Sequence, residues 1–166
     1  MPALYYLNVT IHVLAAMLWL GGMFFIGVVD APLLRAIDPP PLRQRLLQEL
    51  GTRFRRVGWW AITVLVTTGI INLHYHGWLH WNGVFGSADF WRTSAGHALA
   101  LKLFAVASMV IMSATHDFVL GPRAGRAVAG SPEAIALRKR AALYARLNAI
   151  LGVLLVVAAV WLARGG

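Results

Sequence analysis

Residues 4–29 read LYYLNVTIHVLAAMLWLGGMFFIGVV, an apolar run that contains Asn8, Thr10 and His12. A helix needs about 20 mostly apolar residues to cross the hydrocarbon core of a bilayer. The run is therefore predicted to span a membrane. It lacks a basic leading segment and is too long for the core of a cleavable signal peptide, so we expect it to be retained as a helix.

Three later stretches have the same apolar character, near residues 57–75, 95–120 and 136–163. The 166-residue chain is 59% hydrophobic and 13% charged, with a mean hydropathy of +0.67, whereas a soluble domain of this size needs far more polar surface. These features predict an all-α fold: an integral membrane, up-down bundle of four helices that forms a single domain over residues 1–166.

The basic residues are concentrated in two connections, although the net charge of +9 alone would also suit a nucleic-acid binder. Arginine and lysine gather in Asp30–Arg56 and in Gly121–Arg146, while the His76–Arg92 connection holds only Arg92. The positive-inside rule places the two basic connections in the cytoplasm and both termini outside. We therefore predict a multi-pass protein of a bacterial-type inner membrane, with the arginines contacting lipid headgroups rather than nucleic acid.

Local signals predict where the helices begin and end. Asp30-Ala31-Pro32 is expected to end or kink the first helix, because proline removes a backbone donor. Pro39–Pro41 is expected to open a short amphipathic helix that lies along the cytoplasmic surface. Thr93 or Ser94 can cap the third helix, and Ser131-Pro132-Glu133 predicts that the fourth helix begins well before it enters lipid.

Histidine is the residue type that points to a function. The chain has six histidines and no cysteine, so imidazole is its main soft-metal ligand beside a few methionine thioethers. Ionisable side chains in or beside a bilayer are costly and are functional candidates by default. Five of the histidines fall toward the predicted outer face and one toward the inner face: His12, His74, His76, His80 and His97 outside, and His116 inside.

Helical geometry predicts that several of these residues converge. At 1.5 Å per residue, His12 and Lys102 both lie about 12 Å below the outer ends of their helices. Asn8 lies one turn above His12 and can hydrogen-bond the second imidazole nitrogen, as the partners of metal-binding histidines do. We predict a site in the outer half, between the first three helices, with His74 or His97 as a second ligand. The fourth span carries no histidine, methionine or carboxylate and is expected to supply only packing.

Three hypotheses follow from these residues. The first is a b-type haem with His12 as an axial ligand, since four-helix proteins hold cofactors between facing helices. Lys102 would then meet a propionate or transfer protons. The protein would act in electron transfer or membrane oxidoreduction with a redox partner or quinone, and a homodimer is one expected form. The second is a copper site among the outer histidines, and the third is a structural protein whose polar residues join helices without a ligand. The candidate metal ligands of the site are His12, His74, His76 and His97.

Three runs resemble a known family. IHVLAAMLWLGGMFF with APLLR (Ile11–Phe25, Ala31–Arg35), RFRRVGWWAITVLVTTGI (Arg53–Ile70) and LALKLFAVASMVIMSATHDFVLGPR (Leu99–Arg123) are similar to segments of the CopD-like membrane proteins. That resemblance implies a copper uptake or handling permease.

The histidine of the first span and the lysine of the third also resemble the layout of the HemJ proteins, four-helix haem-binding membrane proteins linked to protoporphyrinogen oxidation. This second resemblance implies roles for His12 and Lys102. Haem is thus the first hypothesis, copper handling the second and protoporphyrinogen oxidation a further alternative.

Overall fold

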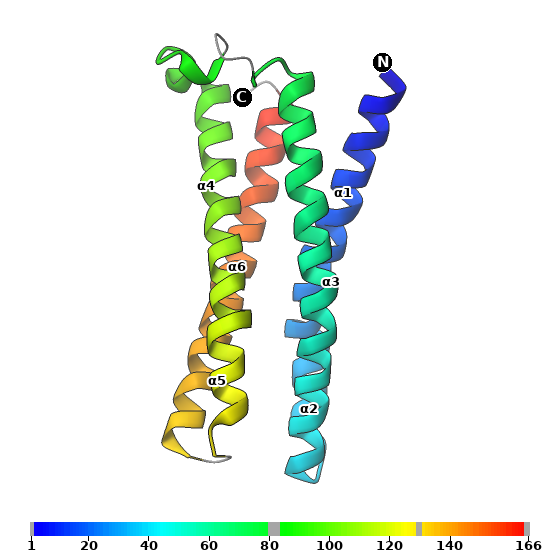
Figure 1. Ribbon diagram of the computed structural model, residues 1–166, viewed down its shortest axis with the longest axis vertical. Coiled ribbons are helices and arrows are strands. Elements are labelled where there is room, and N and C mark those ends of the chain that lie inside the picture. The colour runs from blue at the N-terminus through cyan, green and yellow to red at the C-terminus, as the bar shows by residue number, and fades with distance from the viewer. Residues whose placement is uncertain (1, 80–83, 129–130, 165–166) are drawn as a thin grey trace. The chain divides into compact units, whose positions relative to one another are not determined.

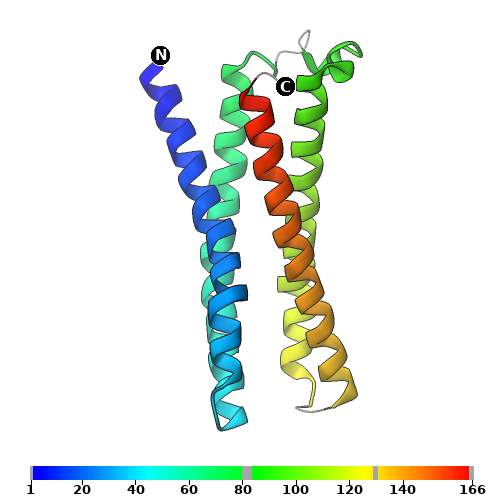
Figure 2. The same cartoon turned by 180° about the vertical axis from the view of Figure 1, so that it is seen from behind.

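The computed structural model describes residues 2–79, 84–128 and 131–164, most of which are helical. The chain divides into two compact units, Met1–Gly86 and Ser87–Gly166. In the first unit α1 (Pro2–Phe25) runs antiparallel to α3 (Pro40–Tyr75), and in the second α4 (Ser94–Ala114) runs antiparallel to α6 (Pro132–Ala163) (Figures 1 and 2). Each unit is therefore a helical hairpin. The prediction of one domain for the whole chain stays a prediction.

Four helical segments of the described residues are long and apolar enough to cross a membrane: Ala3–Arg35, Pro41–Tyr75, Ser94–Arg126 and Pro132–Trp161. Large apolar side chains point outward from them, among them Phe104, which is 68% exposed, and Met17, which is 65% exposed. Such exposure is expected where lipid, not water, surrounds the helices, because lipid tails are as apolar as the side chains. The predicted all-α class with four membrane-spanning helices is confirmed.

Small residues line the contact inside the first hairpin. The buried positions of α1 include Ala15 and Trp19, and those of α3 include Gly58 and Ala61, at the three- and four-residue spacing of one helix face. The Trp19 ring lies against Gly58, where an added Cβ would meet its Cδ1 atom at 3.6 Å. Without a hydrophobic driving force between helices in lipid, close backbone approach at small residues supplies much of the packing.

The first span does not end where the sequence suggested. Helical structure continues from α1 through a π-helical segment, η1 (Ile26–Asp30), into α2 (Ala31–Arg35). The Ala31 N–H donates to the Ile26 carbonyl oxygen, five residues back. The wider turn relieves the clash that the Pro32 ring would make with the preceding turn, so the proline is accommodated rather than terminating the helix.

The short surface helix predicted after Pro39–Pro41 is not a separate helix in the structure. It is the first part of α3, which runs without a break from Pro40 to Tyr75. At 1.5 Å per residue, a helix of 36 residues is about 54 Å long, which exceeds the hydrocarbon core by about 24 Å. The arginine-bearing part therefore extends the span instead of lying beside it.

The start signals of the second hairpin are confirmed. The Thr93 hydroxyl oxygen accepts a hydrogen bond of 3.1 Å from the Gly96 N–H at the start of α4. The Ser131 hydroxyl oxygen accepts one of 3.1 Å from the Ala134 N–H at the start of α6. Both are N-cap bonds that satisfy a donor left over at a helix start.

Candidate functional site

His12 lies inside the first hairpin, at the contact between α1 and α3. It is ten residues beyond the start of α1, about 15 Å along the helix axis. Its Nδ1 atom is 2.7 Å from the Thr68 hydroxyl oxygen on α3. The imidazole ring also lies over Gly69, where an added Cβ would meet its Cε1 atom at 3.6 Å. The imidazole is thus held by α3 on two sides.

The Thr68 hydroxyl determines which nitrogen of His12 carries the proton. That hydroxyl lies 2.6 Å from the Val64 carbonyl oxygen, which can only accept a hydrogen bond. Since a hydroxyl has a single hydrogen, its oxygen accepts from His12 Nδ1–H. In the neutral imidazole the lone pair is then on Nε2. The network assigns His12 the tautomer in which Nε2 carries the lone pair that a metal ion could use.

Asn8 joins the same network from one turn above His12. Its side-chain nitrogen donates to the Thr68 carbonyl oxygen at 3.0 Å and to the Asn72 side-chain oxygen at 2.8 Å. Asn8 is only 8% exposed, so these bonds satisfy an amide that would otherwise be costly inside the span. From the sequence we predicted that Asn8 hydrogen-bonds the imidazole of His12. In the structure Thr68 makes the contact with Nδ1, and Asn8 hydrogen-bonds Thr68 and Asn72 instead.

Thr68 and Asn72 of α3 and His76, the residue that caps it, follow one another at the four-residue spacing of one helix face. Asn8 and His12 repeat that spacing on α1. We call these five residues the polar stripe. It runs from the exposed end of the hairpin to His12, between helices whose other faces are largely apolar. Thr68 and Asn72 were absent from the predicted site, although the Thr-x3-Asn-x3-His spacing was visible in the sequence.

The exposed end of the stripe is an aromatic and imidazole cluster. His76 meets the Tyr5 ring edge-on at 6.1 Å between centroids and the Trp78 ring at 5.2 Å, and His74 meets Tyr75 at 6.4 Å. Both His74 and His76 are exposed. The end of the hairpin therefore presents two reachable imidazoles on a largely aromatic surface.

The end of α3 fixes the position of His76. Gly77 adopts a φ of +71°, the left-handed conformation that favours glycine. The Gly77 N–H donates to the His74 carbonyl oxygen at 2.9 Å, and the Trp78 N–H donates to the Leu73 carbonyl oxygen at 3.0 Å. These two bonds are those of the Schellman motif.

The remaining predicted site residues lie in the second hairpin. His97 is exposed in the first turn of α4, where its N–H donates to the Thr93 carbonyl oxygen at 2.9 Å. Lys102 is half-buried farther along α4. The structure brings together Asn8 with Thr68 and Asn72, and His12 with Thr68; a common site of His12 with His97 and Lys102 stays a prediction. His80 lies outside the described residues.

No group of three or more histidine, aspartate or glutamate side chains able to hold a metal ion is found among the described residues. A multi-ligand metal cage is therefore not formed by the part of the chain that the structure describes. A site with one or two histidines, as at His12 and at the hairpin end, is compatible with this finding.

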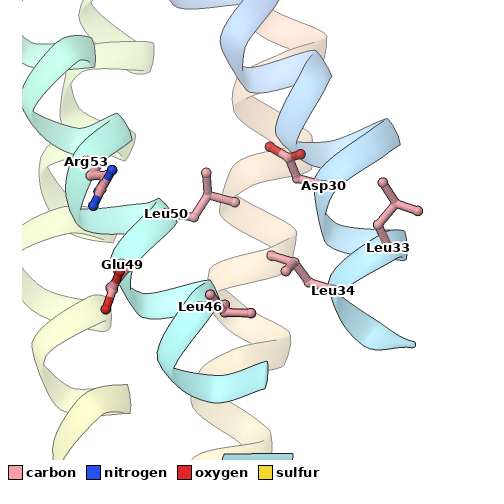
Figure 3. Close-up of a pocket in the computed structure, with 7 residues that line it drawn as sticks. All are labelled: Asp30, Leu33, Leu34, Leu46, Glu49, Leu50 and Arg53. Atoms are coloured by element: carbon pink, nitrogen blue, oxygen red, sulfur yellow. The ribbon is translucent and has the colours of Figure 1, made fainter. Parts of the chain in front are cut away.

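The far end of the first hairpin carries an open groove of about 370 Å³ between α2 and α3 (Figure 3). Four leucines form its apolar wall: Leu33, Leu34, Leu46 and Leu50. Asp30, Glu49 and Arg53 complete the lining, and Glu49 also pairs with Arg45 at 3.1 Å. The groove contains no imidazole or thioether, so it lacks the ligands that copper prefers.

Comparison with known proteins assigns the family. The model of the family "CopD: Copper resistance protein D" matches residues 48–162, most of the chain. The chain belongs to the CopD family. The predicted resemblance is thereby confirmed, and with the four apolar helices it makes this a multi-pass membrane protein. The match contains Thr68, Asn72, His74 and His76, while Asn8 and His12 precede it.

One curated relative is an uncharacterized protein of Aquifex aeolicus, 38% identical over 65 residues. The aligned part is 39% of this chain and 44% of the relative, so the chain spans less than half of that protein's length. No solved structure matches the chain. These comparisons support copper handling more than haem; haem, oxidoreduction and a redox partner receive no support from them and stay predictions.

Proposed function

We propose that this CopD-family protein handles copper within the membrane, binding the ion at the exposed histidine end of the first hairpin and passing it to His12. The observation that carries this proposal is the Thr68-held imidazole of His12, inside an apolar span and at the end of the polar stripe. The family's description names copper resistance, and imidazole is a good copper ligand in a chain without cysteine.

Each part of the stripe has a defined task in this proposal. His74 and His76, exposed at the hairpin end, bind copper from the aqueous side. Asn72 and Asn8 offer polar groups on the way inward and hold the two helices together. His12 binds the ion through Nε2, because Thr68 occupies Nδ1. Such a hydrogen bond fixes the ring orientation and raises the basicity of the ligating nitrogen.

Haem b is the second candidate, and the same observation favours it. An imidazole whose Nδ1–H is hydrogen-bonded, so that the lone pair lies on Nε2, is also what an axial haem ligand requires. In this alternative His74 or His97 supplies the second axial ligand and Lys102 meets a propionate. The protein would then transfer electrons instead of copper.

One experiment separates the two candidates. The protein is purified in detergent, its absorption spectrum is recorded, and Cu(I) binding is measured by competition with bicinchoninate under ascorbate. We expect no Soret band and at least one tightly bound Cu(I), with one equivalent lost in His12→Ala and none lost in Thr10→Ala. Thr10 is a fair control because it is exposed and its hydroxyl donates within α1, to the Tyr6 carbonyl oxygen at 2.8 Å. A Soret band that disappears in His12→Ala would establish the haem alternative instead.

A further inference from the structure

The second hairpin contains its own π-helical segment, η4 (Thr115–Leu120), between α4 and α5 (Gly121–Arg126). The Gly121 N–H donates to the His116 carbonyl oxygen, five residues back, directly before Pro122. As at Pro32, the wide turn accommodates a proline within a continuing helix. π-Helical turns are rare and occur frequently at functional sites. This one holds His116 and Asp117.

His116 is oriented by the carboxylate beside it. Its Nδ1 atom lies 2.9 Å from Asp117 Oδ1. An ionised carboxylate only accepts hydrogen bonds, so Nδ1 carries the proton and the neutral ring has its lone pair on Nε2. The Asp117 side chain is 17% exposed and the His116 side chain is 41% exposed. The carboxylate is therefore mostly sheltered from solvent, while the imidazole can be reached. A carboxylate–histidine pair of this kind is the usual support of a metal-ligating histidine.

Met112 carries a thioether, a soft metal-ligand type, one helical turn before His116. It precedes His116 by four residues and is half-buried. Residues four apart on a helix are neighbours on its surface. A thioether with an imidazole suits Cu(I), which prefers soft ligands.

The topology predicted from the sequence puts this pair at the membrane face opposite the His74 and His76 end. His116 is 22 residues beyond Ser94, about 33 Å along the helix, which is close to the thickness of the hydrocarbon core. In the up-down topology predicted from the sequence, the third span starts at the face where the second span ends. With that topology, His116 is expected at the other face.

We propose that Met112 and His116 form a second Cu(I) site, with Met112 Sδ and His116 Nε2 as ligands, at the membrane face opposite the first. Asp117 is a positioning residue that holds the imidazole. This inference rests on the proposed copper function and extends it: a carrier of copper across a bilayer needs a ligand set at each face.

The test is a Cu(I) titration of the purified protein by competition with bicinchoninate under ascorbate. We expect the double variant Met112→Leu/His116→Gln to lose one equivalent of Cu(I) while the equivalent that depends on His12 remains. Met17→Leu, on α1, is the matched thioether control and is expected to lose none. Undiminished binding by a folded double variant would overturn the second site alone, whereas absence of any Cu(I) binding by the wild type would overturn the copper function itself.

Two further measurements distinguish ligation from general structural effects. X-ray absorption of the copper-loaded protein should show a copper–sulfur shell that the volume-conserving Met112→Leu removes; the same shell in wild type and variant would contradict the ligand assignment. Asp117→Ala should weaken this site by about 10- to 100-fold. Asp117→Asn, whose amide oxygen can still accept from Nδ1, should restore part of that affinity, and equal affinities for wild type and Asp117→Ala would remove Asp117 from the site.

Discussion

At the scale of single residues, Thr68 has the most consequential position in the first hairpin. Its hydroxyl donates its one hydrogen to the Val64 carbonyl oxygen, with 2.6 Å between the two oxygens. The same hydroxyl oxygen accepts from His12 Nδ1, at 2.7 Å. A threonine that bonds back to its own helix is common in membrane spans. Here the same bond selects the tautomer of a histidine on the neighbouring helix.

Removing the Thr68 hydroxyl should therefore weaken copper binding without removing a ligand. We expect Thr68→Ala to lower Cu(I) affinity by about 10- to 100-fold, the usual effect of losing the partner of a ligating histidine. Thr68→Ser, which keeps the hydroxyl, should stay close to wild type.

The neighbouring Thr67 is the matched control, since it is exposed and its loss should leave affinity unchanged. The Cu(I) affinities of Thr68→Ala, Thr68→Ser and Thr67→Ala are measured by competition with bicinchoninate. Equal affinity of Thr68→Ala and Thr67→Ala would mean that the His12 tautomer has no bearing on binding.

The sequence located some of these residues but not their relations. The depth of His12 and its place beside Asn8 followed from counting residues along one helix. The partner of the imidazole could not be predicted in this way, because it depends on the register between α1 and α3. Packing of small residues such as Gly58 and Ala61 sets that register, and a single helical pattern does not contain it.

At the scale of elements, Pro32 was expected to end or kink the first helix, and instead it follows a π-helical turn within a helix that continues. Pro122, for which no prediction was made from the sequence, follows a π-helical turn in the same way. Proline is expected to break a helix because it lacks a backbone donor and its ring clashes with the preceding turn. A widened turn satisfies both constraints while the helix continues, as at Pro32 and Pro122. N-cap signals predicted the helix starts correctly because an N-cap is a local bond that needs no tertiary partner.

The end of α3 offers a second prediction at this scale. Gly77→Ala should lower the free energy of unfolding by about 1–2 kcal/mol, because an L-residue is strained in the left-handed conformation. Gly125→Ala, in α5, should cause no such loss, since that glycine has no positive φ and nothing lies within 4 Å of an added Cβ. The free energy of unfolding is measured for both variants in the same detergent. Equal values would show that the Schellman turn does not depend on Gly77.

At the scale of the whole molecule, composition was sufficient for the class. Four apolar segments predicted four membrane helices, and the described residues contain them. The placement of basic residues predicts more, namely that both termini and the 76–92 connection face outward while the arginine-rich connections face the cytoplasm.

The absence of cysteine makes that orientation easy to test. A cysteine at Ser87 should react with an impermeant maleimide in intact spheroplasts, because its connection is predicted outside. A cysteine at Thr52, in the basic region, should react only after the membrane is opened. Reversed labelling of the two positions would invert the predicted topology.

Transfer of copper to His12 within the membrane is the central claim, and the second site extends it to movement across the bilayer. Uptake by proteoliposomes tests this account most directly. Vesicles containing the wild-type protein should accumulate Cu(I) faster than protein-free vesicles, and Thr10→Ala should match the wild type. His12→Ala should fall to the protein-free rate, because the ion then loses its ligand inside the span. Uptake by folded His12→Ala at the wild-type rate would contradict the account.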